Sequence, residues 1–365
     1  MSDICVFHQR SDGVPVKTLL KSGVTSTVCV DPLCTHGEEC PLYGCVYPDG
    51  STAITVGNYY CFARESRGET LLLAYDMTSG DVRELTRGED SLLLMYGYER
   101  YLYYSAARRG ENGGEVVNSY EIFRADIGSG KIISIQSDGG YSSESRVSTE
   151  DFPSIYAIDS GRIFWYTPAE RGYIFYTTDL AGKDRRGLDI DNPRIMNGAY
   201  HDGWAYYTIF NNTGSFSDCD SDLERLRFMN EKTLRRCNVA TGEDELVLDN
   251  LSEYIVTDGG VYFTVCESEP REIKLGKDTY YDLFAGKIYR MKPDGSDAEL
   301  FCSLGQIDLS VHGRLFLGCA GSRLALAFRD EIKNDYYDSG FEYNISPDII
   351  IVDGISGEWE ISRTD

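Results

Sequence analysis

Short apolar and aromatic runs alternate along the chain with turns of glycine, aspartate, asparagine and serine. Two such runs are "GRIFWY" from Gly161 and "GGVYFT" from Gly259. Runs of this length that follow a turn residue are typical of β-strands. The 27 tyrosines and 37 glycines also favour strands and tight turns, and long helical heptads are absent. The pattern therefore predicts an all-β protein.

A strand, a glycine turn and a further strand recur six times, spaced by 50 to 62 residues and centred on Gly80, Gly130, Gly182, Gly242, Gly295 and Gly357. This period fits one four-stranded antiparallel blade per repeat. A blade is a small twisted sheet with two faces to bury, and packing in a closed ring buries both. We therefore expect a single β-propeller domain over residues 1–365.

The number of blades depends on the N-terminal segment. "VPVKTLLKSGVTSTVCV" has the same form around Gly23, and "ICVFHQ" from Ile4 could precede it as another strand. We expect seven blades, with an incomplete three-stranded first blade near residues 4–30, a last blade near 306–363, and closure without a C-terminal strand. Six blades with an N-terminal appendage are the alternative. Four polar inserts are expected to form surface loops, at 106–119, 211–231, 267–283 and 330–347.

The net charge of −24 limits the classes of partner. Nucleic acid and anionic lipid are excluded as partners because binding either needs a clustered basic surface. No apolar run approaches the roughly 18 residues of a membrane span. The start, "MSDICVFHQR", lacks a secretion signal, so the chain as written is expected in the cytoplasm. An extracytoplasmic setting would follow if a leader had been removed.

The segment "CVDPLCTHGEEC" gathers chemistry that the repeats lack, with Cys29, Cys34, His36 and Cys40 in twelve residues and Cys45 shortly after. Zinc prefers four tetrahedral Cys and His ligands, and three thiolates with one imidazole make a closed, structural site. A disulfide and ordinary buried thiols are the alternatives. We expect these four residues to converge on one loop between the first blade and the next and to hold zinc.

Two further expectations concern the remaining cysteines. Cys45 would replace His36 as a zinc ligand if the imidazole points away. The other thiols fall mostly within strand-like segments and are expected in the core: Cys5, Cys61, Cys219, Cys237, Cys266, Cys302 and Cys319.

No catalytic motif stands out, since the chain has no G-x-S-x-G elbow. Our leading hypothesis is a non-catalytic binding scaffold that presents acidic, tyrosine-bearing loops to a protein, peptide or carbohydrate. The alternative is a propeller enzyme, a carbohydrate-active hydrolase or lyase that uses acidic residues at the central channel. Such chemistry needs two carboxylates at a defined separation, and 59 acidic residues give no means of choosing the pair.

Two resemblances agree with this fold. "IYRMKPDGS" at 288–296 resembles the turn of the YWTD propellers of low-density lipoprotein receptors, and "YTTD" at Tyr176, "YYT" at Tyr206 and "YFT" at Tyr262 look like degenerate forms of their Y-W-T-D strand. The cysteine segment is similar to the C-x-D-P-x-C-x-H…C-P segment of uncharacterised propeller proteins of gut Firmicutes, through Cys29, Asp31, Pro32, Cys34, His36, Cys40 and Pro41. Both resemblances imply a propeller and no particular activity.

Overall fold

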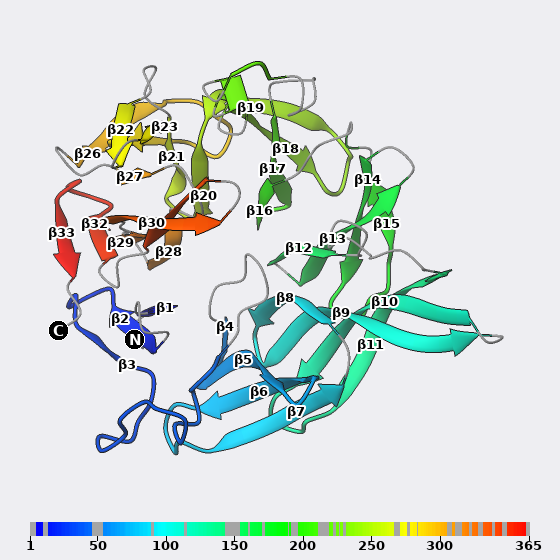
Figure 1. Cartoon of the computed structure of the whole chain (residues 1–365). Helices are drawn as coiled ribbons and strands as arrows, with labels where there is room; N and C mark the ends of the chain where they lie inside the picture. Colours follow the sequence, from blue (N-terminus) through cyan, green and yellow to red (C-terminus); the bar gives the residue numbers. More distant parts are fainter. Residues whose placement is uncertain are drawn as a thin grey trace.

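Seven antiparallel sheets form a ring in the computed structural model (Figure 1). The structure describes the whole chain except residues 1–4, 10–13, 46–53, 89–90, 113–114, 143–153, 160, 170–171, 189, 191–195, 211–218, 222–223, 226, 229–230, 266–270, 276–277, 283, 305–308, 311–315, 321–322, 328–330, 338–339, 345–348 and 363–365. The predicted seven-bladed β-propeller is confirmed.

The first blade has three strands, β1 (Cys5–Gln9), β2 (Pro15–Leu19) and β3 (Thr25–Thr27). Each of the other six has four strands, which follow one another from the innermost to the outermost. The second to fourth blades are β4 (Ile54–Val56), β5 (Tyr59–Ser66), β6 (Glu69–Asp76) and β7 (Val82–Gly88); β8 (Ser91–Tyr98), β9 (Tyr101–Asn112), β10 (Glu115–Asp126) and β11 (Ile132–Ser142); and β12 (Ser154–Asp159), β13 (Arg162–Ala169), β14 (Gly172–Asp179) and β15 (Arg186–Leu188).

The fifth to seventh blades follow the same order around the ring. They are β16 (Met196–His201), β17 (Trp204–Phe210), β18 (Lys232–Asn238) and β19 (Asp244–Leu251); β20 (Glu253–Thr257), β21 (Gly260–Thr264), β25 (Lys287–Met291) and β26 (Glu299–Ser303); and β28 (Phe316–Ala320), β29 (Arg323–Ala327), β32 (Ile349–Asp353) and β33 (Trp359–Ser362).

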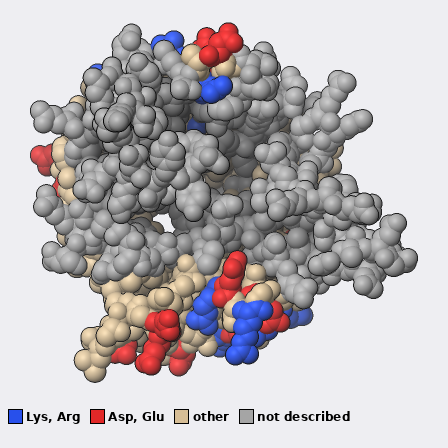
Figure 2. Space-filling model, viewed as in Figure 1, with Lys and Arg blue, Asp and Glu red and all other residues tan. Residues whose placement is uncertain are grey.

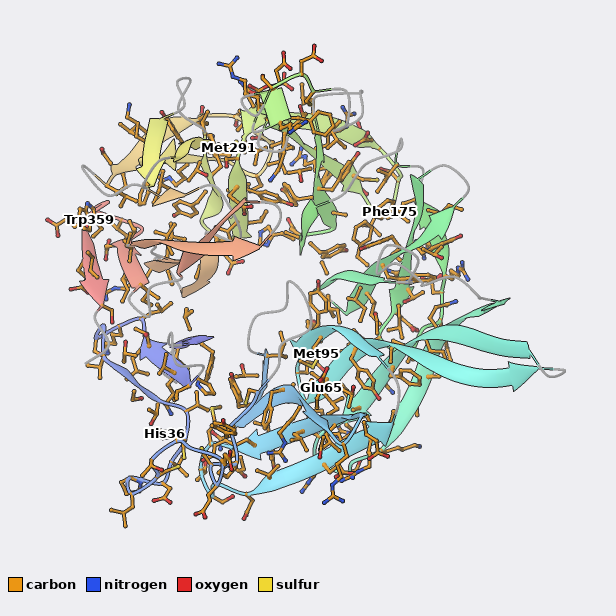
Figure 3. The ribbon with its side chains drawn as sticks, viewed as in Figure 1. His36, Glu65, Met95, Phe175, Met291 and Trp359 are labelled. Carbon is orange, nitrogen blue, oxygen red and sulfur yellow. The ribbon has the colours of Figure 1, made fainter. Side chains whose placement is uncertain are left out.

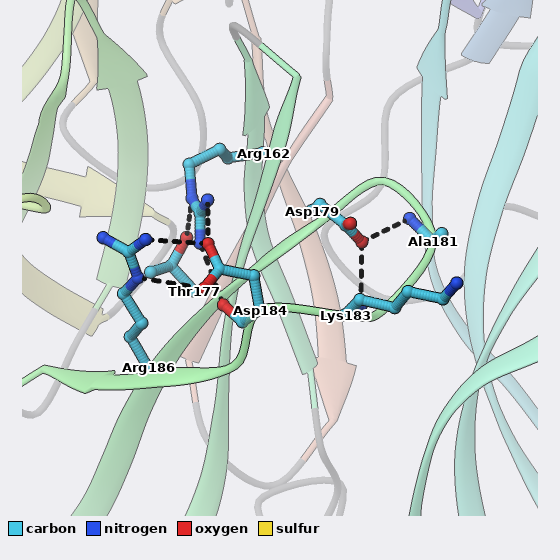
Figure 4. A network of polar contacts seen from close by, with 7 residues as sticks. All are labelled: Arg162, Thr177, Asp179, Ala181, Lys183, Asp184 and Arg186. Carbon is cyan, nitrogen blue, oxygen red and sulfur yellow. Dashed lines mark hydrogen bonds and ion pairs between the residues drawn. The ribbon is translucent and has the colours of Figure 1, made fainter.

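The glycine turn joins the third and fourth strands of every complete blade. All six predicted glycines have positive φ, which L-residues with a Cβ rarely adopt. In the fourth blade the Asp179 carboxylate accepts the N–H groups of Ala181, at 2.9 Å, and Lys183, at 2.7 Å (Figure 4). Beside this turn Asp184 pairs with Arg162 at 3.1 Å and with Arg186 at 2.9 Å. The aspartate fixes the turn and the glycine permits it.

The core lies between blades. Between the fifth and sixth blades, Tyr206 and Leu234 on one side meet Val261 and Met291 on the other, all buried. An arginine also crosses several of these joints. Arg124 donates to the Leu180 carbonyl of the next blade at 2.8 Å, and Arg236 does the same to Pro293 at 3.1 Å.

The ring closes through side chains between the seventh and first blades. Val6 and Leu20 pack on Ala325, Ile349 and Ile351 of the seventh blade. The Ser362 hydroxyl lies 2.5 Å from the Gly23 carbonyl oxygen and 3.0 Å from the Thr25 hydroxyl. Among the described strands none from the C-terminus pairs with the first blade, in agreement with the predicted closure.

The inserts are more regular than the expected surface loops. The described residues of 106–119 lie in β9 and β10, which pair as an extended hairpin. Two others hold hairpins of their own, β22 (Arg271–Leu275) with β23 (Asp278–Asp282), and β30 (Glu331–Tyr337) with β31 (Gly340–Asn344). β24 (Phe284–Ala285) pairs with β27 (Leu309–Ser310). Backbone pairing orders these polar segments, and composition does not reveal it.

The described surface seen in Figure 2 carries acidic and basic side chains interspersed rather than a basic patch. In the described part of the chain, no helix has the length and apolarity needed to cross a membrane.

Candidate metal centre

The cysteine loop, residues 28–45, follows β3 and packs against the second blade. Val28, Cys29, Cys40 and Leu42 are buried in one cluster with Tyr60, Phe62, Leu71, Leu73 and Tyr75 of β5 and β6. Figure 3 places His36 on the outer side of the ring, between the first two blades. This is the predicted position. Burial contributes to ordering the loop, although its sequence looks mainly polar.

Tight turns bring the loop back on itself. The Asp31 carboxylate accepts the Leu33 N–H at 2.9 Å, and the Asp31 carbonyl accepts the Cys34 N–H at 3.2 Å. The Gly37 carbonyl accepts the Cys40 N–H at 2.8 Å. Asx turns and single backbone turns of this kind fold a chain without strands. They place three thiols and an imidazole on the same side of the loop.

The four predicted residues come together. Cys29, Cys34, His36 and Cys40 each offer one ligand atom, and these atoms all lie within 4.8 Å of one another. The His36 Nδ1 is 3.9 Å from the Cys40 Sγ, and the Cys34 Sγ accepts the His36 N–H at 3.4 Å. Tetrahedral zinc would hold such atoms about 3.6 Å apart, so small side-chain movements would complete the site. The group therefore fits a metal ion.

His36 has a left-handed backbone, with φ of 57°. A residue with a Cβ adopts this conformation at a cost, and such positions gather where function needs them. The imidazole of this residue lies with its Nδ1 3.9 Å from the Cys40 Sγ. The strain is local to the residue whose side chain completes the group.

Burial affects the protonation of the Cys40 thiol. Together with the neighbouring thiols of Cys34 and Cys29, burial raises the pKa of Cys40 to about 12. A nearby divalent cation would act in the opposite direction because metal ligands are thiolates. All four ligand positions are filled by protein, so the set suits a closed structural site rather than a catalytic one with an open position.

Cys45 lies apart from this group. Its thiol donates to the Leu42 carbonyl at 2.8 Å, and burial raises its pKa to about 12. Cys45 nevertheless lines a pocket of about 260 Å³ together with Cys29, His36 and Cys40. Because His36 points inward, the substitution of Cys45 for His36 is not needed.

The cysteines that the structure describes are free thiols, including the four loop cysteines, Cys29, Cys34, Cys40 and Cys45. Of the expected core thiols, Cys61, Cys237 and Cys302 are buried, while Cys5, Cys219 and Cys319 are half-buried. Cys266 lies outside the described residues.

One polar pair could not be foreseen from the sequence. Lys232 at the start of β18 and Glu253 at the start of β20 are both buried, with the Lys232 Nζ 4.0 Å from the Glu253 Oε1. Lys232 also donates to the Ser252 carbonyl at 3.2 Å. No motif marks either residue, because the pair forms only when the fifth and sixth blades meet. The matched charges support a structural role at this joint.

Known structures confirm the fold. An oligogalacturonate lyase in complex with manganese shares 12% identity at a TM-score of 0.50, over 98% of this chain and 83% of that one. An acylaminoacyl peptidase bound to a chloromethyl ketone shares 10% identity at 0.52, over 99% of this chain and 50% of that one. A chain of a nidogen/laminin complex shares 10% identity at a TM-score of 0.42, over 81% of this chain and 92% of that one.

At 10–12% identity, the likeness to the lyase and the peptidase shows a propeller fold and leaves the activity open. No family model and no curated protein matches the chain. The resemblance of residues 29–41 to the gut Firmicutes segment therefore rests on those residues alone.

Proposed function

We propose that the protein is a non-catalytic binding scaffold whose inserts present acidic, tyrosine-bearing surfaces to a protein, peptide or carbohydrate. The observation that carries this proposal is where the inserts join the blades. All four connect the second strand of a blade to the third: β9 to β10, β17 to β18, β21 to β25 and β29 to β32. Repeated blades place equivalent connections on the same face of a propeller. The inserts therefore share one face.

Six described carboxyl groups have a lowered pKa, and each accepts hydrogen bonds from backbone N–H groups, hydroxyls or arginines: Asp76, Glu84, Asp126, Asp184, Asp294 and Asp353. These groups stabilise turns and outer strands.

Ligand screening with matched enzyme assays tests the scaffold. We expect thermal-shift binding to a glycan or peptide and no turnover in hydrolase and lyase assays. Replacing β30–β31 by a short glycine turn should abolish the shift while leaving the melting temperature of the free protein within a few degrees. Robust turnover of any substrate would overturn the scaffold and favour the alternative, a carbohydrate-active hydrolase or lyase.

We also propose that Cys29, Cys34, His36 and Cys40 hold zinc in a structural role. Three soft thiolates and one imidazole are a typical zinc set. Titration with cobalt(II) tests the geometry, because a tetrahedral thiolate site gives intense visible absorption and sulfur-to-cobalt charge-transfer bands. Zinc should displace the cobalt. Cobalt spectra without these bands would contradict the site.

A further inference from the structure

The turn of the first blade shows which of its strands are present. In the second blade the Asp76 N–H donates to the Asp81 carbonyl, and the Gly80 N–H to the Asp76 carbonyl, both at 2.8 Å. In the first blade the Leu19 N–H donates to the Val24 carbonyl at 2.9 Å, and the Gly23 N–H to the Leu19 carbonyl at 2.8 Å. The β2–β3 turn is thus the turn that joins the third and fourth strands elsewhere.

The arginine contacts give the same alignment. The glycine turns of the fourth and sixth blades begin at Asp179 and Lys292. Arg124 and Arg236 of the preceding blades donate to the carbonyl of the next residue in each turn, Leu180 and Pro293. Arg323 of the seventh blade binds the equivalent carbonyl of the first blade, that of Leu20, at 2.7 Å, and also that of Lys21 at 2.9 Å. By this measure too, β2 and β3 are the third and fourth strands.

Packing agrees with β1 as a second strand. Between the fifth and sixth blades, Tyr206 of the second strand β17 meets Val261 and Phe263 of the second strand β21. On one side β1 places Val6 against Ala325 of β29, the second strand of the seventh blade. On the other side the ring centre of Phe7 lies 5.6 Å from that of Tyr60 in β5, the second strand of the second blade. Among the described residues, the innermost strand of the first blade is therefore missing.

The register shows which backbone groups this leaves open. The Pro15 carbonyl accepts the Val28 N–H, and the Leu19 N–H donates to the Val24 carbonyl, so the backbone groups of Pro15 and Leu19 face β3. The backbone groups of Val16 and Thr18 therefore face β1. They pair with His8 and Val6. Successive residues of a strand bond in opposite directions. Cys5, Phe7 and Gln9 therefore direct their N–H and C=O groups away from β2, toward the channel.

We propose that this open edge binds an extended segment of a partner protein as the missing inner strand; the proposal rests on the scaffold function and specifies one of its partners. Among the described residues no strand pairs with β1 on its channel side, and β28 and β4 are the inner strands of the adjacent blades. Addition of a strand to an exposed edge supplies affinity through main-chain hydrogen bonds.

The six existing inner strands define the chemistry of the occupant. Four of them have a small residue within the strand: Gly97, Ala157, Ala199 and Gly318. A Cβ on Gly97 would lie 2.3 Å from the Thr55 carbonyl oxygen of the neighbouring inner strand, which explains the small side chain. The occupant is thus an extended segment of about five residues with a small residue within it. The net charge of −24 favours basic flanks.

Synthetic peptides test the edge directly. Six peptides with the sequences of the inner strands β4, β8, β12, β16, β20 and β28, each flanked by lysines, are titrated into the whole protein. We expect at least one to bind. N-methylation of every second residue on the side that pairs with β1 should weaken binding at least about tenfold, and N-methylation on the channel side should not. No binding by any peptide, or equal loss from both sets, would overturn the proposal.

Two measurements on the protein complete the test. In the free protein the amides of Cys5, Phe7 and Gln9 should exchange faster than those of Val6 and His8, and peptide should slow them. Slow exchange beforehand would mean that a chain segment or second copy fills the position, which contradicts the proposal. Cys5→Pro removes one open-edge donor at the first residue of β1 and should weaken binding, unlike Cys5→Ala. The β30–β31 replacement should leave this peptide binding intact, which separates this proposal from the function of the insert face.

Discussion

Two joints of the ring differ in how closely their blades approach. Between the fifth and sixth blades, the Gly295 turn lies against β19, and a Cβ on Gly295 would be 2.5 Å from the Val247 carbonyl oxygen. At the closure between the seventh and first blades, a Cβ on Gly23 would meet only side chains, the nearest being Glu360 at 3.6 Å. Backbone packing stabilises the first joint, whereas the second depends on side chains. The incomplete blade therefore needs support from its other side, where the cysteine loop lies.

The strongest way to disturb this difference is to remove the proposed metal. Cys34→Ser should lower the melting temperature by about 5 °C or more, because a structural ion contributes its binding energy to folding. Cys45→Ser is the matched control, since its hydroxyl can keep the hydrogen bond to Leu42 and it lies outside the ligand group. Equal losses for the two variants would mean that the loop holds no ion.

Glycine substitutions sharpen the comparison of the joints themselves. Gly295 and Gly23 both have positive φ, 86° and 70°, so each alanine variant should lose about 1 kcal/mol in unfolding free energy. Gly295→Ala should lose roughly 2 kcal/mol more, because its methyl group meets rigid backbone. Urea unfolding measures both. Similar losses would show that the two joints are equally tight.

The closure arginine should show a smaller effect. Arg323→Gln leaves the Leu20 and Lys21 carbonyls without their charged donor, which should reduce stability by about 1–3 kcal/mol and speed amide exchange in β1–β3. Arg87→Gln, which breaks exposed pairs with Glu84 and Glu69, should leave stability nearly unchanged. Unchanged exchange in β1–β3 would contradict a closure that depends on Arg323.

The smallest expected effect concerns acid. Hydrogen bonds from the Ser356 and Ile355 N–H groups lower the pKa of Asp353 below its usual 3.8. A lowered pKa stabilises the folded state above the ordinary value, and this contribution is lost as pH falls below about 3.8. The first blade has Leu19 at this position. Asp353→Asn should therefore flatten the dependence of unfolding on pH between about 4 and 2, as followed by urea titration. A slope equal to that of the unchanged protein would rule this out.

The repeat could be read from the sequence because each turn needs the same local chemistry. An acceptor such as Asp179 and a glycine such as Gly182 recur where the third and fourth strands of the six complete blades join. Seven blades followed once the Gly23 turn was counted with them. The hairpins within the inserts were missed because their pairing has no apolar alternation to reveal it.

The candidate site was foreseeable for a similar reason. Cys29, Cys34, His36 and Cys40 are close in sequence, so one loop can gather them without long-range information. Long-range contacts were invisible: the Lys232–Glu253 pair joins two blades, and the open edge of β1 emerges only from the register and the neighbouring joints. The same limit hides any channel carboxylates from the sequence.

The support of the incomplete blade depends most on the ion that would fix the loop beside it. Elemental analysis of protein purified without added metal tests this most directly. We predict about one zinc per chain, bound by Cys29, Cys34, His36 and Cys40. Zinc below about 0.2 per chain, with mass spectrometry showing every loop thiol reduced and free, would contradict the metal centre and leave these residues as ordinary buried cysteines.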